Sequence, residues 1–239
     1  MKTIEPLYIA LDFESADAAL TFLQQNQLQG VPVKVGMELF YKEGPSIIKQ
    51  LNDRGNPIFL DLKLHDIPMT VKRAMASLAS LKVDVVNVHA QGGSEMIAAA
   101  KEGLAALENP PLLLAVTQLT STNQSMLEEE LKVQAPLQEI VQHYALLAKN
   151  SGADGVVCSV KEVSFIREVC GKQFVTLTPG IRRQLDEHHD QKRVATPFEA
   201  GKQGSHSIVV GRSITQAENP LRTYQMIKEE LQHGQQSIH

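Results

Sequence analysis

The chain has 239 residues, of which 43% are hydrophobic and 21% charged, and its formal net charge is −4. These proportions are typical of a globular protein and exclude a disordered chain. The small acidic excess argues against nucleic acid as a partner, and no run approaches the ~20 apolar residues of a membrane span. Two cysteines are too few for a disulfide framework, and the first residues lack the pattern of a signal peptide. We therefore expect a cytoplasmic protein.

Short apolar runs alternate with longer amphipathic segments along the chain. Eight runs are rich in Val, Ile and Leu and too short for helices, so they are predicted to be buried strands. They comprise residues 7–11, 31–35, 58–62, 83–88, 112–116, 154–158, 174–177 and 207–210. Helical spacing of apolar residues predicts helices over residues 15–25, 44–54, 67–79 and 95–107.

About eight strand–helix units predict an α/β fold, a (β/α)8 TIM barrel. A doubly wound sheet is the alternative, but it more naturally has about five or six strands. No shift in composition, low-complexity segment or internal repeat marks a second domain. We therefore expect residues 1–239 to form a single barrel domain.

Polar residues stand at or just beyond the carboxyl end of nearly every predicted strand. In a barrel these ends converge on the one face where active sites are built. Contact with water explains one or two such residues, but it explains poorly the charges inside apolar runs, because a buried charge is costly unless it is paired. The residues are Asp12, Lys34, Asp61, Lys63, Asn87, His89, Thr117, Thr120, Ser159, Thr178, Gly211 and Arg212.

The densest group of charges lies in FLDLKLHDIPMT, residues 59–70. Side chains two apart on a strand share a face, so Asp61 and Lys63 are predicted to point into the barrel while the intervening leucines face the helices. Lys34, on the neighbouring strand, can join them. A single pair would suggest a structural ion pair, but this many charges on one barrel face favour catalysis. Asp66 precedes Ile-Pro, so a helix cap is an alternative interpretation for it.

The loops after the last two strands have the composition of a phosphate site. The sequence TPGIR, residues 178–182, follows the seventh strand, and Gly211-Arg212 follows the eighth. Glycine allows the backbone to approach an anion closely, and arginine offers a planar fork of donors. Barrels often bind phosphate at this position. For Arg182, the sequence alone favours a surface salt bridge.

A polar segment without clear periodicity extends over residues 180–196. Loops of about this length inside a compact domain are usually functional or disordered, so we expect a lid that closes over the phosphate. His188 and His189 are interpreted as solvated lid residues, because they lack the ligand spacing of a known metal site. His89 is expected to be a satisfied core histidine and Cys158 a small buried apolar residue.

Taken together, these motifs resemble the orotidine 5′-phosphate decarboxylase family. DLKLHDIP carries D-x-K-x-x-D at Asp61, Lys63 and Asp66, and ALDF, VKVGMELFYKEG, VNVHA, VTQLTS, TPGIR, DQKRVATP and VVGRSI follow the family order over essentially the whole chain. The resemblance implies decarboxylation of orotidine 5′-monophosphate to uridine 5′-monophosphate (UMP) and CO2 in pyrimidine biosynthesis, without a metal. We also expect no cofactor, since no G-x-G-x-x-G follows the first strand and no Walker motif occurs.

The resemblance further implies residue roles. Catalysis is expected from a charged network in which Lys63 protonates C6 of the pyrimidine, together with Asp61, Asp66 and Lys34. Substrate binding is expected from Asp12, Lys34, Thr70, Thr120, Ser121, Pro179, Arg182, Gln191, Gly211 and Arg212. Within this set, Asp12 and Lys34 hold the ribose, Thr120 and Ser121 meet the pyrimidine, and Gly211 and Arg212 bind phosphate with Gln191 closing over it. Read without the family, the sequence favours a capped loop for Thr120 and Ser121.

The resemblance also implies a homodimer with shared active sites, in which Asp66 and Thr70 are lent to the partner subunit.

Two other functions remain open. Magnesium-dependent sugar-phosphate decarboxylases and aldolases of the same suprafamily carry D-x-K-x-x-D, but they hold the metal partly through a glutamate on the second strand. Here that strand offers Lys34, which cannot bind a metal while protonated. A non-catalytic nucleotide-binding barrel would keep Arg212 without needing both Asp61 and Lys63.

Overall fold

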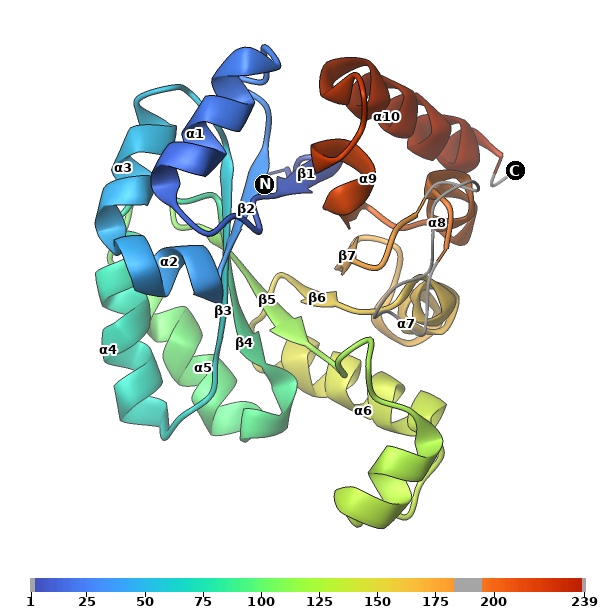
Figure 1. Cartoon of the computed structure of the whole chain (residues 1–239). Coiled ribbons are helices and arrows are strands. Elements are labelled where there is room, and N and C mark those ends of the chain that lie inside the picture. Colours follow the sequence, from blue (N-terminus) through green and yellow to red (C-terminus); the bar gives the residue numbers. More distant parts are fainter. Residues whose placement is uncertain (1–2, 183–194, 238–239) are drawn as a thin grey trace.

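A computed structural model describes residues 3–182 and 195–237, and these residues form a closed barrel of eight parallel strands (Figure 1). Each strand pairs with the next, and β8 closes the barrel against β1. The predicted (β/α)8 TIM barrel is confirmed, and the doubly wound alternative is wrong because its sheet would have two free edges. Strand ends differ from the predicted ones by at most two residues: β1 (Leu7–Ala10), β2 (Val33–Gly36), β3 (Ile58–Leu64), β4 (Val85–His89), β5 (Leu112–Val116), β6 (Gly155–Val157), β7 (Val175–Thr178) and β8 (Ser207–Val210).

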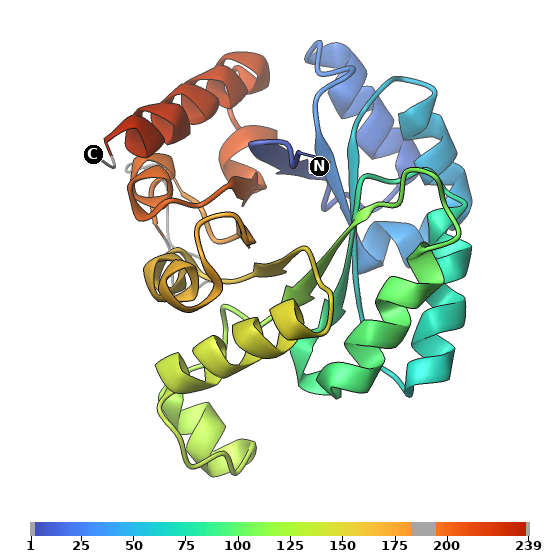
Figure 2. The ribbon, with the colours of Figure 1, turned by 180° about the vertical axis from the view of Figure 1, so that it is seen from behind.

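Helices surround the barrel, as the two opposite views show (Figures 1 and 2). The four predicted helices are present as α1 (Ala16–Gln25), α3 (Pro45–Asn52), α4 (Pro68–Ala79) and α5 (Gly93–Leu104). The others are α2 (Met37–Glu43), α6 (Leu137–Asn150), α7 (Val163–Cys170), α8 (Pro197–Gln203), α9 (Arg212–Thr215) and α10 (Pro220–Gln236). Before α6, the chain projects from the barrel and includes a π-helical turn, Met126–Glu130 (Figure 1). Within the described ranges, no helix combines the length and the apolar character needed to cross a membrane.

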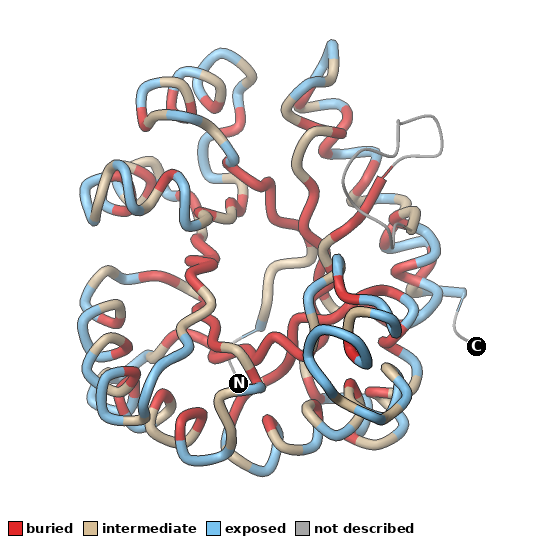
Figure 3. The backbone as a smooth tube through the Cα atoms, turned by 60° about the horizontal axis from the view of Figure 1, so that its bottom comes forward, coloured by how far each residue is buried: buried red, intermediate tan, exposed pale blue. Residues whose placement is uncertain are grey.

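Two hydrophobic cores follow from the two-residue period of the strands. The larger core lies between the strands and the surrounding helices. In Figure 3, buried residues gather around the centre of the molecule and exposed residues lie mostly at its periphery. The smaller core fills the barrel interior with side chains such as Tyr8, Phe59, Leu114 and Leu177. The rings of Tyr8 and Phe59 meet edge to face there, with centroids 6.0 Å apart. Two residues beyond Phe59, the next inward position of β3 is the charged Asp61, so the apolar interior gives way to polar groups at the carboxyl ends.

Candidate active site

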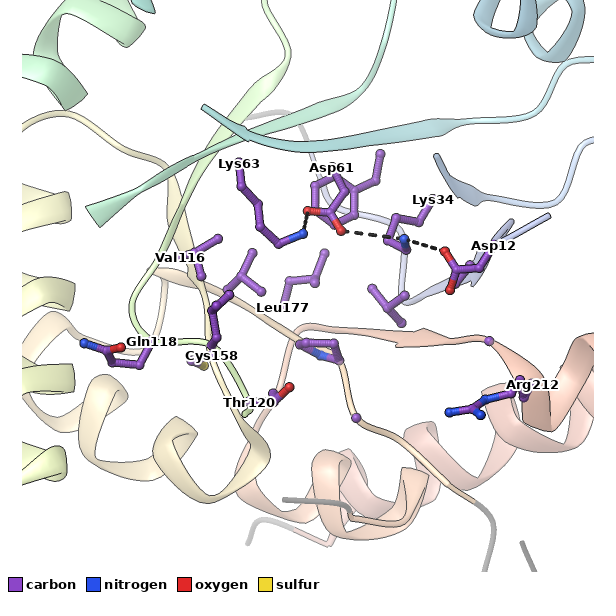
Figure 4. A pocket seen from close by; sticks show the side chains of 18 of the residues that line it. Asp12, Lys34, Asp61, Lys63, Val116, Gln118, Thr120, Cys158, Leu177 and Arg212 are labelled. Carbon is purple, nitrogen blue, oxygen red and sulfur yellow. Dashed lines mark hydrogen bonds and ion pairs between the residues drawn. The ribbon is translucent and has the colours of Figure 1, made fainter. Parts of the chain in front are cut away.

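A pocket with a volume of about 290 Å³ opens at the carboxyl ends of the strands (Figure 4). Its inner wall is the top of the barrel core, formed by Ala10, Phe59, Val116, Val157, Leu177 and Val209. Charged and polar side chains surround this apolar surface: Asp12, Lys34, Asp61, Lys63, Gln118, Thr120, Arg182 and Arg212. Such a combination is typical of small-molecule sites, in which apolar contact gives affinity and a few polar groups fix orientation.

Four charged side chains of alternating sign form a continuous row along one side of the pocket (Figure 4). Asp12 Oδ1 lies 3.1 Å from Lys34 Nζ, Lys34 Nζ lies 3.6 Å from Asp61 Oδ2, and Asp61 Oδ1 accepts a 2.7 Å hydrogen bond from Lys63 Nζ. We call these four residues the charged row. The predicted inward orientation of Asp61 and Lys63 is confirmed, and Lys34 joins them from β2 as expected.

Asp61 is the central member of the charged row. Burial by itself would raise the pKa of its carboxyl, but the positive charges of Lys34 and Lys63 and the hydrogen bonds from Lys63 and Asn87 outweigh this effect. The pKa of Asp61 is therefore held below its ordinary value. The residue is a carboxylate at neutral pH and fixes two ammonium groups on either side of it.

The backbone of Lys63 departs from the regular strand that the sequence predicts. Its φ angle is 50°, in the left-handed region that non-glycine residues rarely adopt. The pairing of β3 with β4 also shifts register. Leu60 pairs with Val86, but Leu64, four residues further along β3, pairs with Val88, only two residues further along β4. The Lys63 N–H donates to the side-chain oxygen of Asn87 at 2.8 Å. The sequence marked Asn87 only as one of many polar strand ends and gave it no role.

The loops after β7 and β8 form the opposite side of the pocket. Pro179, Arg182, Gly211 and Arg212 line it, as expected, and Gly180 joins them. Arg182 is only 8% exposed, and its Nη1 donates to the carbonyl of Ile181 at 2.8 Å. A surface salt bridge is therefore the wrong interpretation for Arg182, because the side chain is buried against the pocket wall.

Among the predicted site residues that the structure describes, three do not line the pocket of their own chain, although Thr120 does. Ser121, Asp66 and Thr70 are all exposed. Asp66 Oδ1 accepts the backbone N–H of Ile67 at 2.6 Å, and α4 begins after Ile67 as its N-cap residue. The alternative interpretation of Asp66 as the helix cap is therefore wrong.

Some polar strand ends proved to be structural. Thr117 Oγ1 donates to the carbonyl of Val157, Thr178 shares a hydrogen bond with Ser205, and Ser159 forms a capping box with Glu162. Their residue types alone did not separate them from the pocket residues. Conversely, the sequence assigned no site role to Gln118, Leu119 or Cys158, which line the pocket. Gln118 and Leu119 belong to the same VTQLTS motif as Thr120, and that proximity was the available signal.

Two other expectations concern single residues. Cys158 is buried as expected, in addition to its place on the pocket wall. His89 is half-buried, and its ring centroid lies 5.7 Å from that of His65. Burial, together with the nearby His65 and Lys63, lowers the pKa of His89 and favours its neutral form.

The predicted lid over residues 180–196 is described only at its two ends. Ile181 and Ala195 form a bridge, and the Arg182 N–H donates to the Ala195 carbonyl at 3.0 Å. Gln191, His188 and His189 lie outside the described residues, so their roles stay predictions. In the part of the chain that is described, no three His, Cys, Asp or Glu residues gather in a way that could hold a metal ion.

Comparison with known proteins decides the family. Residues 5–227 match the model of the "Orotidine 5'-phosphate decarboxylase / HUMPS family". The chain belongs to this family. It is 56% identical over 230 residues to an orotidine 5′-phosphate decarboxylase of Geobacillus sp. (strain WCH70), covering 95% of this chain and 96% of that one. It is 58% identical over 228 residues to that of Bacillus cytotoxicus, covering 94% and 96%.

A solved structure agrees with this relationship. The crystal structure of an orotidine 5′-phosphate decarboxylase from Lactobacillus acidophilus superposes with a TM-score of 0.86 at 44% identity, covering 96% of this chain and all of that one.

Proposed function

We propose that this chain decarboxylates orotidine 5′-monophosphate to UMP and CO2, with Lys63 as the proton donor. The observation that carries the proposal is the charged row, which ends at the Lys63 ammonium beside an apolar pocket wall. In the proposed complex, the Lys63 ammonium would lie where the carbanion forms. The relatives of the chain are named orotidine 5′-phosphate decarboxylases, which supports the same reaction.

The pocket accommodates the parts of the substrate in order. Arg182 and Arg212 offer guanidinium groups for the phosphate, and the Gly211 backbone can approach the same anion. Asp12 and Lys34 face the space between these groups and Lys63, where the ribose hydroxyls would lie. The pyrimidine would rest on the apolar wall near Thr120. In this pose, C6 and its carboxylate would lie opposite Lys63.

In the chemical step, the bond between C6 and the carboxylate carbon breaks and CO2 leaves. The electron pair of that bond stays on C6, and Lys63 Nζ transfers a proton to it, becoming a neutral amine that water later reprotonates. The ammonium also stabilises the negative charge as it develops on C6. Asp61 holds Lys63 Nζ at 2.7 Å, so this donor is oriented before the substrate binds.

The size of the barrier reduction that enzymes achieve shows that Lys63 cannot act alone. Enzymes commonly lower barriers by about 8–23 kcal/mol, whereas loss of one preorganised donor costs about 3–4 kcal/mol. The remainder must come from interactions with other parts of the substrate. Binding energy at the phosphate is the main candidate, because it can hold C6 against Lys63 and exclude water from the charged row.

Magnesium-dependent sugar-phosphate chemistry is the second candidate, since the matching family description also includes the HUMPS group. Two observations favour the decarboxylase. The relatives at 56–58% identity carry that name, and Lys34 places an ammonium between the carboxylates of Asp12 and Asp61, where it would repel a divalent cation.

The proposal includes a homodimer with shared sites. Asp66 and Thr70 are exposed in one chain and stand beside Ile67 and Met69, whose exposed fractions are 68% and 53%. Exposed apolar side chains grouped around polar site residues fit an interface better than a solvated surface.

We also place the enzyme in the cytoplasm, because its two cysteines are free thiols.

Incubation of the purified protein with orotidine 5′-monophosphate tests the function. Loss of orotate absorbance and appearance of UMP are expected, at equal rates with and without a chelator. Activity abolished by the chelator and restored by magnesium would favour the sugar-phosphate chemistry. No turnover in either condition would refute the decarboxylase.

A further inference from the structure

We infer that Asn87 is a positioning residue, which holds both the strained backbone of Lys63 and the carboxylate of Asp61 in their reactive arrangement. The inference rests on the proposed function of Lys63. Asn87 lies on β4, is 1% exposed, and is not among the residues that line the pocket. It would therefore act through Asp61 and Lys63 rather than on the substrate.

The side-chain amide of Asn87 makes one hydrogen bond to each of the two residues. Its Oδ1 accepts the backbone N–H of Lys63 at 2.8 Å, and its Nδ2 donates to Asp61 Oδ1 at 2.7 Å. The chemistry of the partners fixes the orientation of the amide, because a backbone N–H can only donate and a carboxylate can only accept. Asp61 Oδ1 is also the atom that accepts from Lys63 Nζ. Backbone, carboxylate and ammonium are thus tied together through one buried amide.

The register shift explains why a side chain is needed here. Between Leu60 and Leu64, β3 carries more residues than the facing stretch of β4, from Val86 to Val88. Asn87 is the residue in the middle of that facing stretch, and its side chain supplies the acceptor for the Lys63 N–H. The left-handed φ of Lys63 is strained for a non-glycine residue and persists only where the surroundings hold it. Asn87 provides that restraint, and the resulting bulge directs Nζ toward Asp61.

Two substitutions separate the two hydrogen bonds. Asn87→Leu keeps the size and removes both. Asn87→Asp can still accept from Lys63 but loses the donor to Asp61 and adds a second carboxylate beside it. The matched control is Thr117→Val, which removes a buried side-chain hydrogen bond made to the carbonyl of Val157 and not to the charged row.

The experiment begins with the turnover of the wild-type protein. If the wild-type protein does not turn over orotidine 5′-monophosphate, the proposed function is wrong, whereas this result does not refute the positioning role of Asn87. In Asn87→Leu we expect kcat to fall by about 10–100-fold, since a displacement near 1 Å can cost ~10²-fold, while affinity for UMP changes less than about twofold. In both variants the acidic limb of the kcat profile should move to higher pH, most in Asn87→Asp, because the hydrogen bond that lowers the pKa of Asp61 is lost. Hydrogen exchange at the Lys63 amide should accelerate in Asn87→Leu more than in Thr117→Val.

Two results would contradict the positioning role of Asn87. If Asn87→Leu were destabilised like Thr117→Val but kept wild-type kcat and pH profile, Asn87 would be a packing residue and the inference would be wrong. Unchanged protection of the Lys63 amide in a folded Asn87→Leu would also refute it, whatever the activity. Should Asn87→Leu fail to fold, Asn87→Asp still tests the contact with Asp61 through the shift of the acidic limb.

Discussion

At the scale of residues, the chemistry depends on a carboxylate that serves two ammonium groups at once. Asp61 lies between Lys34 and Lys63, and its lowered pKa keeps it ionised at neutral pH. Removing one member of such a buried set leaves the others uncompensated, so single substitutions should have large effects. Substitutions of Lys63 and Arg212 test opposite ends of the pocket.

Lys63→Ala should lower kcat by at least about 10³-fold, because it removes both the proton donor and the charge that stabilises the carbanion. The affinity for UMP should change little, since Lys63 acts chiefly in the transition state. Steady-state kinetics and calorimetric titration with UMP measure the two effects. Near-normal turnover in a folded Lys63→Ala would remove Lys63 from the role of proton donor.

Arg212→Ala should raise KM and lower kcat/KM by about 10–100-fold, because a charge-assisted contact to phosphate is lost. The control is orotidine, the nucleoside without phosphate. Its turnover, where measurable, should be insensitive to the substitution. Equal damage to both substrates would show that Arg212 does not bind the phosphate.

At the scale of elements, a histidine just before β8 contacts β7 and the residues before it through hydrogen bonds that need its neutral form. His206 Nδ1 accepts the backbone N–H of Thr176 at 3.1 Å, and Nε2 lies 3.1 Å from the carbonyl of Lys172. Only the neutral ring with its proton on Nε2 satisfies both partners. Burial and the nearby Arg167 lower the pKa of His206. The contact between β7 and β8 is therefore sensitive to acid.

The sign of this effect gives a prediction. Because the folded pKa of His206 lies below the ordinary value of about 6.5, the unfolded chain takes up the proton first. The stabilising contribution is complete above that value and is lost as the pH falls through the folded pKa. His206→Asn keeps a carbonyl acceptor and should make the free energy of unfolding less dependent on pH between 7 and 5. Urea unfolding measures it, and the exposed His233→Asn is the control that should retain the wild-type slope.

At the scale of the whole molecule, the question is how Asp66 and Thr70 reach a site. In one chain they are exposed and outside the pocket, beside the exposed Ile67 and Met69. A two-fold interface would lend each chain's Asp66 to the other reciprocally. The proposed dimer thus explains why residues of the D-x-K-x-x-D motif are separated in the isolated barrel.

Mixing two inactive variants tests the shared site. Under subunit exchange, a heterodimer of Lys63→Ala and Asp66→Ala would hold one site with both lesions and one with neither. Random pairing makes half the dimers mixed, so activity should recover to about a quarter of the wild-type value. If Asp66 served its own chain, every site would carry one lesion and mixing would restore nothing. Sedimentation measurements on each variant must show that both still form dimers.

The barrel and most of one side of its site follow from local patterns in the sequence. Eight buried runs imply a closed parallel barrel, and the two-residue period of a strand places Asp61 and Lys63 on the inner face, because both rules are local. Gly211 and Arg212 were predicted from the loop that follows the last strand, and both line the pocket.

Other features of the site depend on contacts between segments that are distant in the sequence. The register shift of β3, the left-handed backbone of Lys63 and its contact with Asn87 depend on how two strands pair across the barrel. Burial turned Arg182 from a surface cation into a pocket residue, and neighbouring strands made Thr117 and Thr178 structural. Residue type and spacing carry no information on these contacts, because the partners lie far apart in the chain and meet only when the barrel closes.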